Sequence, residues 1–103
     1  MGQGVLYPDW KQVVVYAEEG MQPQVLAEGE QLKSIIGGLA AGNSIPPHPQ
    51  GAAVFHFLEG SGRMLVDDDS FAVTPGATVI VPDGAERGIE AETQLAFLVV
   101  RPS

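Results

Sequence analysis

"VTPGATVIVPDG", residues 73–84, contains two turn signals on either side of a short apolar run. Pro75 and Gly76 suit the central positions of a type II turn, because proline presets φ at the first of them and glycine accepts the positive φ that the second requires. Pro82 and Gly84 mark a second turn. The valines and isoleucine between the turns are typical of a strand, so this stretch predicts two adjacent β-hairpins.

The same alternation of apolar runs and turn residues continues in both directions along the chain. The runs are rich in β-branched and aromatic residues and are separated by Gly, Pro or acidic residues. No run shows a sustained apolar stripe at helical spacing. The expected strands are 11–17, 22–28, 32–40, 52–60, 62–69, 70–75, 77–82, 86–92 and 94–100. This pattern predicts an all-β sandwich or closed barrel.

The length and charge of the chain limit its organisation and its partners. A chain of 103 residues fits one core, so we expect a single domain over 1–103. Only 17% of the residues are charged, against roughly 25% in average soluble proteins. Together with the apolar runs 53–58 and 96–100, this predicts a homodimer. The formal net charge of −8 repels phosphate backbones and anionic lipids, so we expect no nucleic-acid or membrane partner.

The sequence contains no cysteine, so any metal would need histidine, carboxylate or amide donors. The N-terminus lacks the basic start and apolar segment of a secretory signal, and no apolar run is long enough to cross a membrane. We therefore expect a cytoplasmic protein. The segment 1–10, which contains Tyr7, Pro8 and Trp10, is expected to cover a sheet edge or to dock on a second subunit.

The segment from Gly42 to Gly84 carries the glycines and proline of two motifs. The positions of the first motif are occupied by Gly42, His48, Gln50, Ala53 and Gly60. Those of the second are Gly76, Pro82, Gly84 and Arg87. On these residues, and on the closing "FLVVRP", the chain resembles a small single-domain cupin. The resemblance implies a cupin-type double-stranded β-helix, or jelly-roll barrel, often dimeric, whose interior normally holds one divalent metal on three histidines and one glutamate.

Three of the four metal-ligand positions that the resemblance implies are changed in this chain. His48 remains as a standard donor, whereas Gln50 offers only a weak amide oxygen and Ala53 offers nothing. Arg87 carries a permanent positive charge that repels a cation. We therefore expect no metal and no cofactor, and a divalent metal at His48 and Gln50 is the alternative.

The altered motif positions predict a ligand-binding pocket instead. We expect His48, Gln50 and Arg87 to meet at the barrel mouth, with Phe55 and Phe57 as apolar walls. The guanidinium fork suits a carboxylate or phosphate, and imidazole is able to act as an acid or base near neutral pH. His48 is therefore also the candidate catalytic residue. A structural role for His48, hydrogen-bonded to Gln50, and a surface or ion-paired Arg87 remain open.

His56 is expected on the other face of its strand. Side chains alternate along a strand, so if Ala53 faces inward, Phe55 and Phe57 do too and His56 faces outward, on or near a subunit contact. A β-bulge would reverse this parity and make His56 a metal ligand, and a proton-transfer role is also open.

Two classes of function follow, and the sequence does not show whether any reaction is catalysed. The first is a metal-independent barrel that binds a small polar or anionic metabolite, alone or with isomerase-like or lyase-like proton transfer. The second is a metal-dependent dioxygenase or decarboxylase with an unusual ligand set. A structural subunit whose barrel is packed shut is a further alternative, and the presence of a cavity would distinguish it from the first class.

Overall fold

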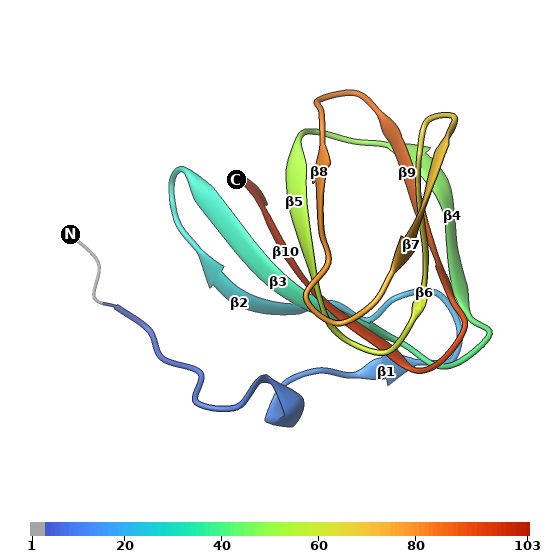
Figure 1. The fold of residues 1–103 in the computed structure, drawn as a ribbon. Coiled ribbons are helices and arrows are strands. Elements are labelled where there is room, and N and C mark those ends of the chain that lie inside the picture. The colour runs from blue at the N-terminus through green and yellow to red at the C-terminus, as the bar shows by residue number, and fades with distance from the viewer. Residues whose placement is uncertain (1–3) are drawn as a thin grey trace.

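The computed structural model describes residues 4–103 and shows two facing β-sheets (Figure 1). The elements are η1 (Trp10–Gln12), β1 (Tyr16–Ala17), β2 (Gln24–Glu28), β3 (Leu32–Leu39), β4 (Ser44–Pro49), β5 (Ala53–Glu59), β6 (Gly62–Val66), β7 (Asp69–Val73), β8 (Thr78–Val81), β9 (Glu86–Ala91) and β10 (Leu95–Pro102). The predicted all-β fold is confirmed. No helix in the described part of the chain has the length and apolarity that a membrane crossing requires.

The larger sheet has the strand order β1-β3-β10-β5-β8, with β2 also paired to β3, and the smaller sheet has the order β4-β9-β6-β7. Strand β10 is central in the larger sheet, because it pairs antiparallel with β3 on one side and with β5 on the other. The inner faces of β3, β5 and β10 look toward those of β4, β6 and β9 (Figure 1). Side chains from these facing strands therefore share one interior.

Strand β5 shows the alternation that the sequence predicts. Ala53, Phe55 and Phe57 are buried, whereas Val54 between them is exposed and His56 is half-buried. The register of β5 with β8 continues without a shift through His56. His56 therefore lies on the outer face, and its ring is not available to the interior.

Both predicted turns are present. The amide of Ala77 donates to the carbonyl of Thr74 across a 3.0 Å hydrogen bond, and Gly76 has the positive φ of 94° that a type II turn needs. In the next turn Gly84 has a φ of 82°, and the first residue is Pro82. These turns join β7 to β8 and β8 to β9, but the prediction of two adjacent hairpins is wrong. Strand β8 pairs with β5 in the larger sheet, whereas β7 and β9 pair with β6 in the smaller sheet, so each turn crosses from one sheet to the other.

The predicted strand over residues 11–17 is wrong for most of its length. Trp10–Gln12 form a 3-10 helix, and only Tyr16–Ala17 pair with β3. Asp9 provides the local reason, because its carboxylate accepts a hydrogen bond of 3.1 Å from the amide of Lys11 and caps the helical turn.

Strand β4 was not predicted, because three of its six residues are proline. Proline has no amide hydrogen for a ladder, and it occurs in sheets only at edges and bulges. Among residues 4–103, β4 lies at the end of the smaller sheet and pairs only with β9, so it is an edge strand in which proline is tolerated.

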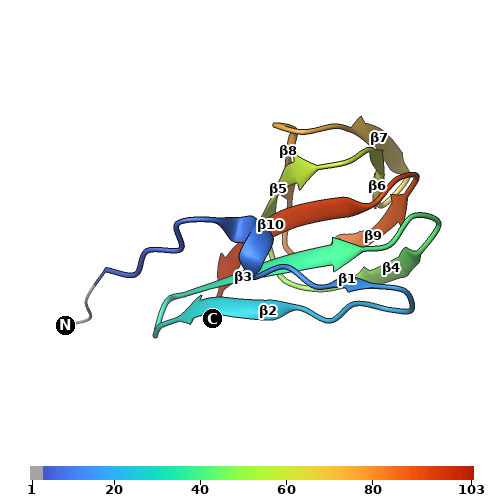
Figure 2. The ribbon, with the colours of Figure 1, turned by 90° about the horizontal axis from the view of Figure 1, so that it is seen from below.

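The described chain before β1, residues 4–15, contains η1, and toward its start it extends away from the sheets (Figure 1, Figure 2). Of the predicted docking segment, residues 1–3 lie outside the described residues. The Tyr7 hydroxyl donates a 2.6 Å hydrogen bond to the carbonyl of Leu26 in β2, which is an edge strand. Val14 packs against β3, where a Cβ on Gly38 would meet its Cγ2 atom at 2.7 Å. Tyr7 thus contacts an edge strand, while the covering of an edge by segment 1–10 and its docking on a second subunit stay predictions.

Candidate functional site

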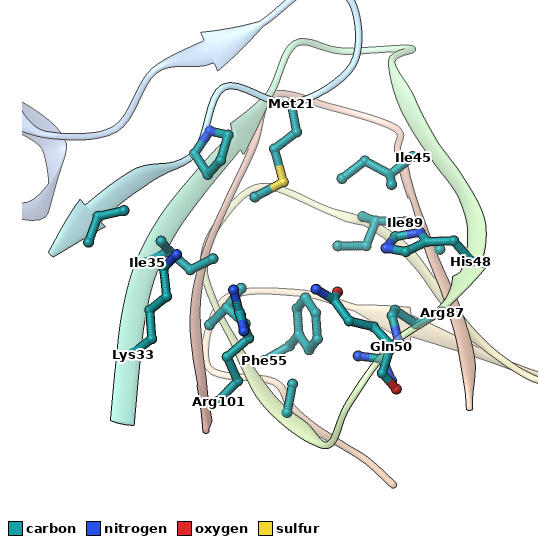
Figure 3. A pocket seen from close by; sticks show the side chains of 15 residues that line it. Met21, Lys33, Ile35, Ile45, His48, Gln50, Phe55, Arg87, Ile89 and Arg101 are labelled. Carbon is teal, nitrogen blue, oxygen red and sulfur yellow. The ribbon is translucent and has the colours of Figure 1, made fainter. Parts of the chain in front are cut away.

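A cavity of about 370 Å³ lies between the inner faces of the two sheets (Figure 3). The larger sheet contributes β2, β3, β5 and β10 to its walls, and the smaller sheet contributes β4 and β9. The residues that line it are Met21, Pro23, Val25, Lys33, Ile35, Ile45, His48, Gln50, Ala53, Phe55, Arg87, Gly88, Ile89, Val99 and Arg101. His48, Gln50, Phe55 and Arg87 therefore meet at one cavity, as the sequence predicts. Most of the wall is apolar.

A β-bulge in β4 sets the position of His48. The register runs from Ile45 opposite Ile89 to His48 opposite Arg87, so two prolines of β4 face the single residue Gly88. A Cβ on residue 88 would lie 2.7 Å from the carbonyl oxygen of Ile45, and glycine is therefore needed for the bulged chain to approach β9. The bulge brings His48 directly across from Arg87 at the cavity wall.

Arg87 is buried and held by backbone carbonyls. Its side chain is only 2% exposed. The Nε atom donates to the carbonyl of Ala85 at 3.1 Å, and Nη2 donates to Ala85 at 3.0 Å and to the carbonyl of Gln50 at 2.9 Å. In residues 4–103 no ion pair joins Arg87 to a carboxylate. The open interpretation of Arg87 as a surface or ion-paired arginine is therefore wrong.

One nitrogen of the Arg87 guanidinium is left for a ligand. None of the hydrogen bonds described for Arg87 uses Nη1, and within residues 4–103 no fully buried side-chain nitrogen or oxygen lacks a partner, so Nη1 reaches accessible space. Burial lowers the pKa of Arg87, while Asp83 and Asp67 oppose the shift. Arginine remains charged under such conditions, which makes Arg87 a fixed positive group at the wall.

His48 is exposed and interacts with its own strand. Its Nδ1 atom lies 3.1 Å from the carbonyl oxygen of Pro46. A carbonyl only accepts hydrogen bonds, so Nδ1 carries a hydrogen, and in the neutral ring Nε2 keeps a free lone pair. The contact with Pro46 replaces the hydrogen bond to Gln50 that the sequence left open. Gln50 instead offers its backbone carbonyl to Arg87 and its side chain to the cavity.

Two further cations, which sequence reasoning missed, lie on the opposite wall. Lys33 of β3 and Arg101 of β10 are directly paired across the strands, and both line the cavity. Figure 3 shows them across the cavity from His48 and Arg87. Alternation would have identified them, because each is two residues from an apolar inward-facing neighbour on its strand, Ile35 or Val99.

Phe57 and His56 lie elsewhere. Phe57 is completely buried and packs against Phe97, with ring centroids 5.7 Å apart, so the structure places it in the core and not on the cavity wall. The Nδ1 atom of His56 lies 2.7 Å from the Oγ1 atom of Thr78 on the outer face of the sheet. Neither side chain reaches the site.

The cavity does not fit the divalent metal that the fold implies. The chemistry of its donors decides this: one imidazole from His48, one amide from Gln50, a methyl group at Ala53 and the cation of Arg87. Within residues 4–103 no three His, Cys, Asp or Glu side chains are grouped so as to hold a metal ion. A transition metal on nitrogen and oxygen ligands needs three or four such donors around one point.

Comparisons with known proteins agree with the fold. The profile of the family described as "Cupin_2: Cupin domain" matches residues 36–101. The protein TT1209 from Thermus thermophilus is 23% identical, with a TM-score of 0.83 over 93% of this chain and 96% of that chain. A cupin superfamily protein from Desulfitobacterium hafniense is 17% identical, with a TM-score of 0.81 over 99% of this chain and 94% of that one.

A more distant neighbour is part of a larger enzyme. The salicylate 1,2-dioxygenase of Pseudaminobacter salicylatoxidans is 24% identical, with a TM-score of 0.66 over 69% of this chain but 21% of that chain. At these identities the likenesses show the fold alone, and no curated protein matches the chain. Because the family profile matches more than half of the 103 residues, the chain belongs to the cupin domain family, and its two sheets form that family's double-stranded β-helix.

Proposed function

We propose that the protein is a metal-independent cupin that binds a small anionic metabolite in the cavity between its sheets. One observation carries the proposal: three of the five Lys and Arg residues of the chain line this cavity, in a protein of net charge −8. The described lining contains no Asp or Glu. Cations concentrated in a partly apolar cavity favour carboxylate or phosphate groups.

The size and composition of the cavity support a small ligand. Its volume of about 370 Å³ lies within the range of roughly 300–1,000 Å³ that is usual for small-molecule sites. Its apolar wall with a few polar groups is also typical of such sites. The alternative of a structural subunit with its interior packed shut has no support in this geometry.

The proposal is tested by calorimetric titration with small carboxylates and phosphates, using hits from a thermal-shift screen. Arg87→Lys keeps the charge but removes the Nη1 donor that the hydrogen bonds to Ala85 and Gln50 leave available, so it should weaken anion binding. Arg63→Lys is the matched control, because Arg63 is exposed and bonded to Ser70 outside the cavity. If no anion binds, or if both variants bind as the parent does, the proposal is wrong.

The metal-dependent alternative is tested by elemental analysis of protein purified without an affinity tag. The donor set predicts far less than one transition metal per chain, because His48 is the single standard donor in the described lining. Stoichiometric metal would overturn the metal-independent proposal.

Proton transfer by His48 is a second candidate, favoured by the free Nε2 atom opposite Arg87. In such a step Nε2 would take a proton from a carbon next to a carbonyl group, and Arg87 would stabilise the resulting enolate. A bound 2-oxo acid should then exchange that hydrogen for deuterium in heavy water, and His48→Gln should stop the exchange. Binding without exchange in the parent protein would reject this role.

We also propose a homodimer through the outer face of β5 and β8. Val54 and Ile80 are paired across these strands, and their side chains are 36% and 67% exposed. Light scattering should give the mass of a dimer for the parent chain and that of a monomer for Ile80→Glu. A parent monomer at micromolar concentration would contradict the proposal.

A further inference from the structure

The positive charge of the cavity is divided between two facing walls. Arg87 lies on β9 in the smaller sheet, whereas Lys33 and Arg101 lie on β3 and β10 in the larger sheet. Packed sheets are separated by about 10 Å, so these are two cationic groups on opposite sides of the interior. Figure 3 shows Phe55 between the two walls.

The positive charges of Lys33 and Arg101 are only partly balanced by carboxylates of the described residues. The two residues are directly opposite on antiparallel strands, where like charges destabilise a sheet. Lys33 Nζ lies 3.8 Å from a carboxylate oxygen of Glu28, whose side chain is 56% exposed. Arg101 donates to the carbonyl of Pro102, and in the described part of the chain it has no carboxylate partner. An anion bound between the two side chains would relieve their repulsion.

The space between the two cationic walls is apolar. Ile35, Phe55, Ile89 and Val99 all line it and belong to the core or pack against it. A ligand with one acidic group would satisfy one wall and leave the other unpaired. A ligand with an acidic group at each end and an apolar middle would match both walls and the space between them.

On this basis we propose that the cavity selects dianionic molecules, with two carboxylates joined by an apolar spacer, over monoanions of the same length. Arg87 binds one carboxylate, and the pair of Lys33 and Arg101 binds the other. This inference rests on the proposed function, because it assumes that anions bind in the cavity. It adds the class of ligand and a second set of binding residues.

The experiment compares matched probes by calorimetric titration. In adipate a carboxylate replaces the terminal methyl group of hexanoate, and terephthalate differs from 4-methylbenzoate in the same way. We expect the dicarboxylate of at least one pair to bind tenfold or more tightly than its monocarboxylate. The double variant Lys33→Met with Arg101→Met should lose this preference, because the second carboxylate then has no cation to bind.

The control is the double variant Lys11→Met with Arg63→Met, which removes the same charge outside the cavity. It should keep the preference for the dicarboxylate. If it loses the preference equally, a general effect of net charge explains the result and the inference is wrong. If the Lys33 and Arg101 variant folds poorly, titrations of the parent protein at low and high salt test the inference instead. Salt screens charges, so the preference for the dicarboxylate should shrink as the salt concentration rises.

The outcomes separate the two proposals. If no probe binds the parent protein, the proposed function itself fails. If hexanoate and adipate bind equally well, and 4-methylbenzoate and terephthalate do too, anion binding stands and the inference about dianions is overturned. If the preference exists and survives in the Lys33 and Arg101 variant, the assignment of the second carboxylate to this pair is overturned.

Discussion

The two halves of the sandwich interior are built by the same strands, yet one half is filled and the other is open. In the filled half Leu39, Phe57 and Phe97 are completely buried. Further along the same inward faces lie Lys33 on β3 and Arg101 on β10, which line the cavity. The backbone arrangement alone therefore does not decide whether an inward position is core or binding surface. The size and charge of the side chains at successive inward positions decide it.

The largest effect is expected from truncating an aromatic ring in the filled half. Phe57→Ala removes a ring that is completely buried against Phe97, and such changes cost about 3–5 kcal/mol of unfolding free energy. Phe55→Ala should cost clearly less, because the Phe55 ring already borders the cavity. Urea unfolding of both variants checks this, and equal losses would mean that the halves do not differ in packing.

The proposed role of the open half as a binding site is tested by measuring how tightly it binds a carboxylate. Arg87→Lys should weaken a bound carboxylate by about 1.5–3 kcal/mol, the range for hydrogen bonds to charged groups. Calorimetry with the tightest ligand from the screen measures this loss. We choose lysine and not alanine as the test substitution, because Arg87→Ala would leave the carbonyls of Ala85 and Gln50 without the donors they now have.

Tyr16, whose hydroxyl contacts Glu59, has a raised pKa. The Tyr16 hydroxyl donates a hydrogen bond to the Glu59 carboxylate, and burial, this hydrogen bond and the Glu59 charge raise the pKa of Tyr16 to about 12. Because the pKa of Tyr16 is higher in the folded protein than its ordinary value of 10.0, the protonated hydroxyl contributes to the unfolding free energy. This contribution is complete below pH 10 and is lost as the pH rises to about 12. Because the half-buried ring is partly screened by solvent, the loss should be about 1–2 kcal/mol.

Alkaline unfolding curves measure this loss. The fall in unfolding free energy between about pH 10 and pH 12 should be shallower in Tyr16→Phe than in the parent, because phenylalanine does not titrate. Tyr7→Phe provides the control, since Tyr7 is exposed and bonded only to a backbone carbonyl. Parallel curves for Tyr16→Phe and the parent would show that the pair does not contribute.

The smallest effect concerns the like-charged pair in the open half. Replacing both Lys33 and Arg101 with methionine keeps the apolar stems but removes the repulsion between opposite residues, so stability should rise by a few tenths of a kcal/mol. Thermal unfolding without ligand measures the change. A clear loss of stability would show that Lys33 and Arg101 stabilise the fold, and it would contradict the predicted repulsion between them.

Much of the fold was predictable because it depends on local rules. Gly76 and Gly84 have positive φ values that few other residues tolerate, and alternation placed Phe55 inward and His56 outward. Two segments were not predicted. The cap at Asp9 favours a helical turn over Trp10–Gln12, where the sequence predicts the start of a strand. The prolines of β4 are acceptable only because of that strand's place at a sheet edge.

The candidate site was predictable only in part. The motif positions brought His48, Gln50 and Arg87 to one cavity, as expected. Alternation indicates only that Lys33 and Arg101 face inward, and the pairing of β3, the third strand, with β10, the last, brings them together. Such non-local pairing cannot be obtained from the spacing of residues along the sequence.

The prolines of β4 also affect how this protein meets other chains. An exposed edge strand offers free amide hydrogens and carbonyls on which a further strand can form, and this is a common route to aggregation. In β4, Pro46, Pro47 and Pro49 have no amide hydrogen to offer. The same residues that position His48 therefore prevent the smaller sheet from growing at this edge, so that copies of the protein can be concentrated without their sheets joining there.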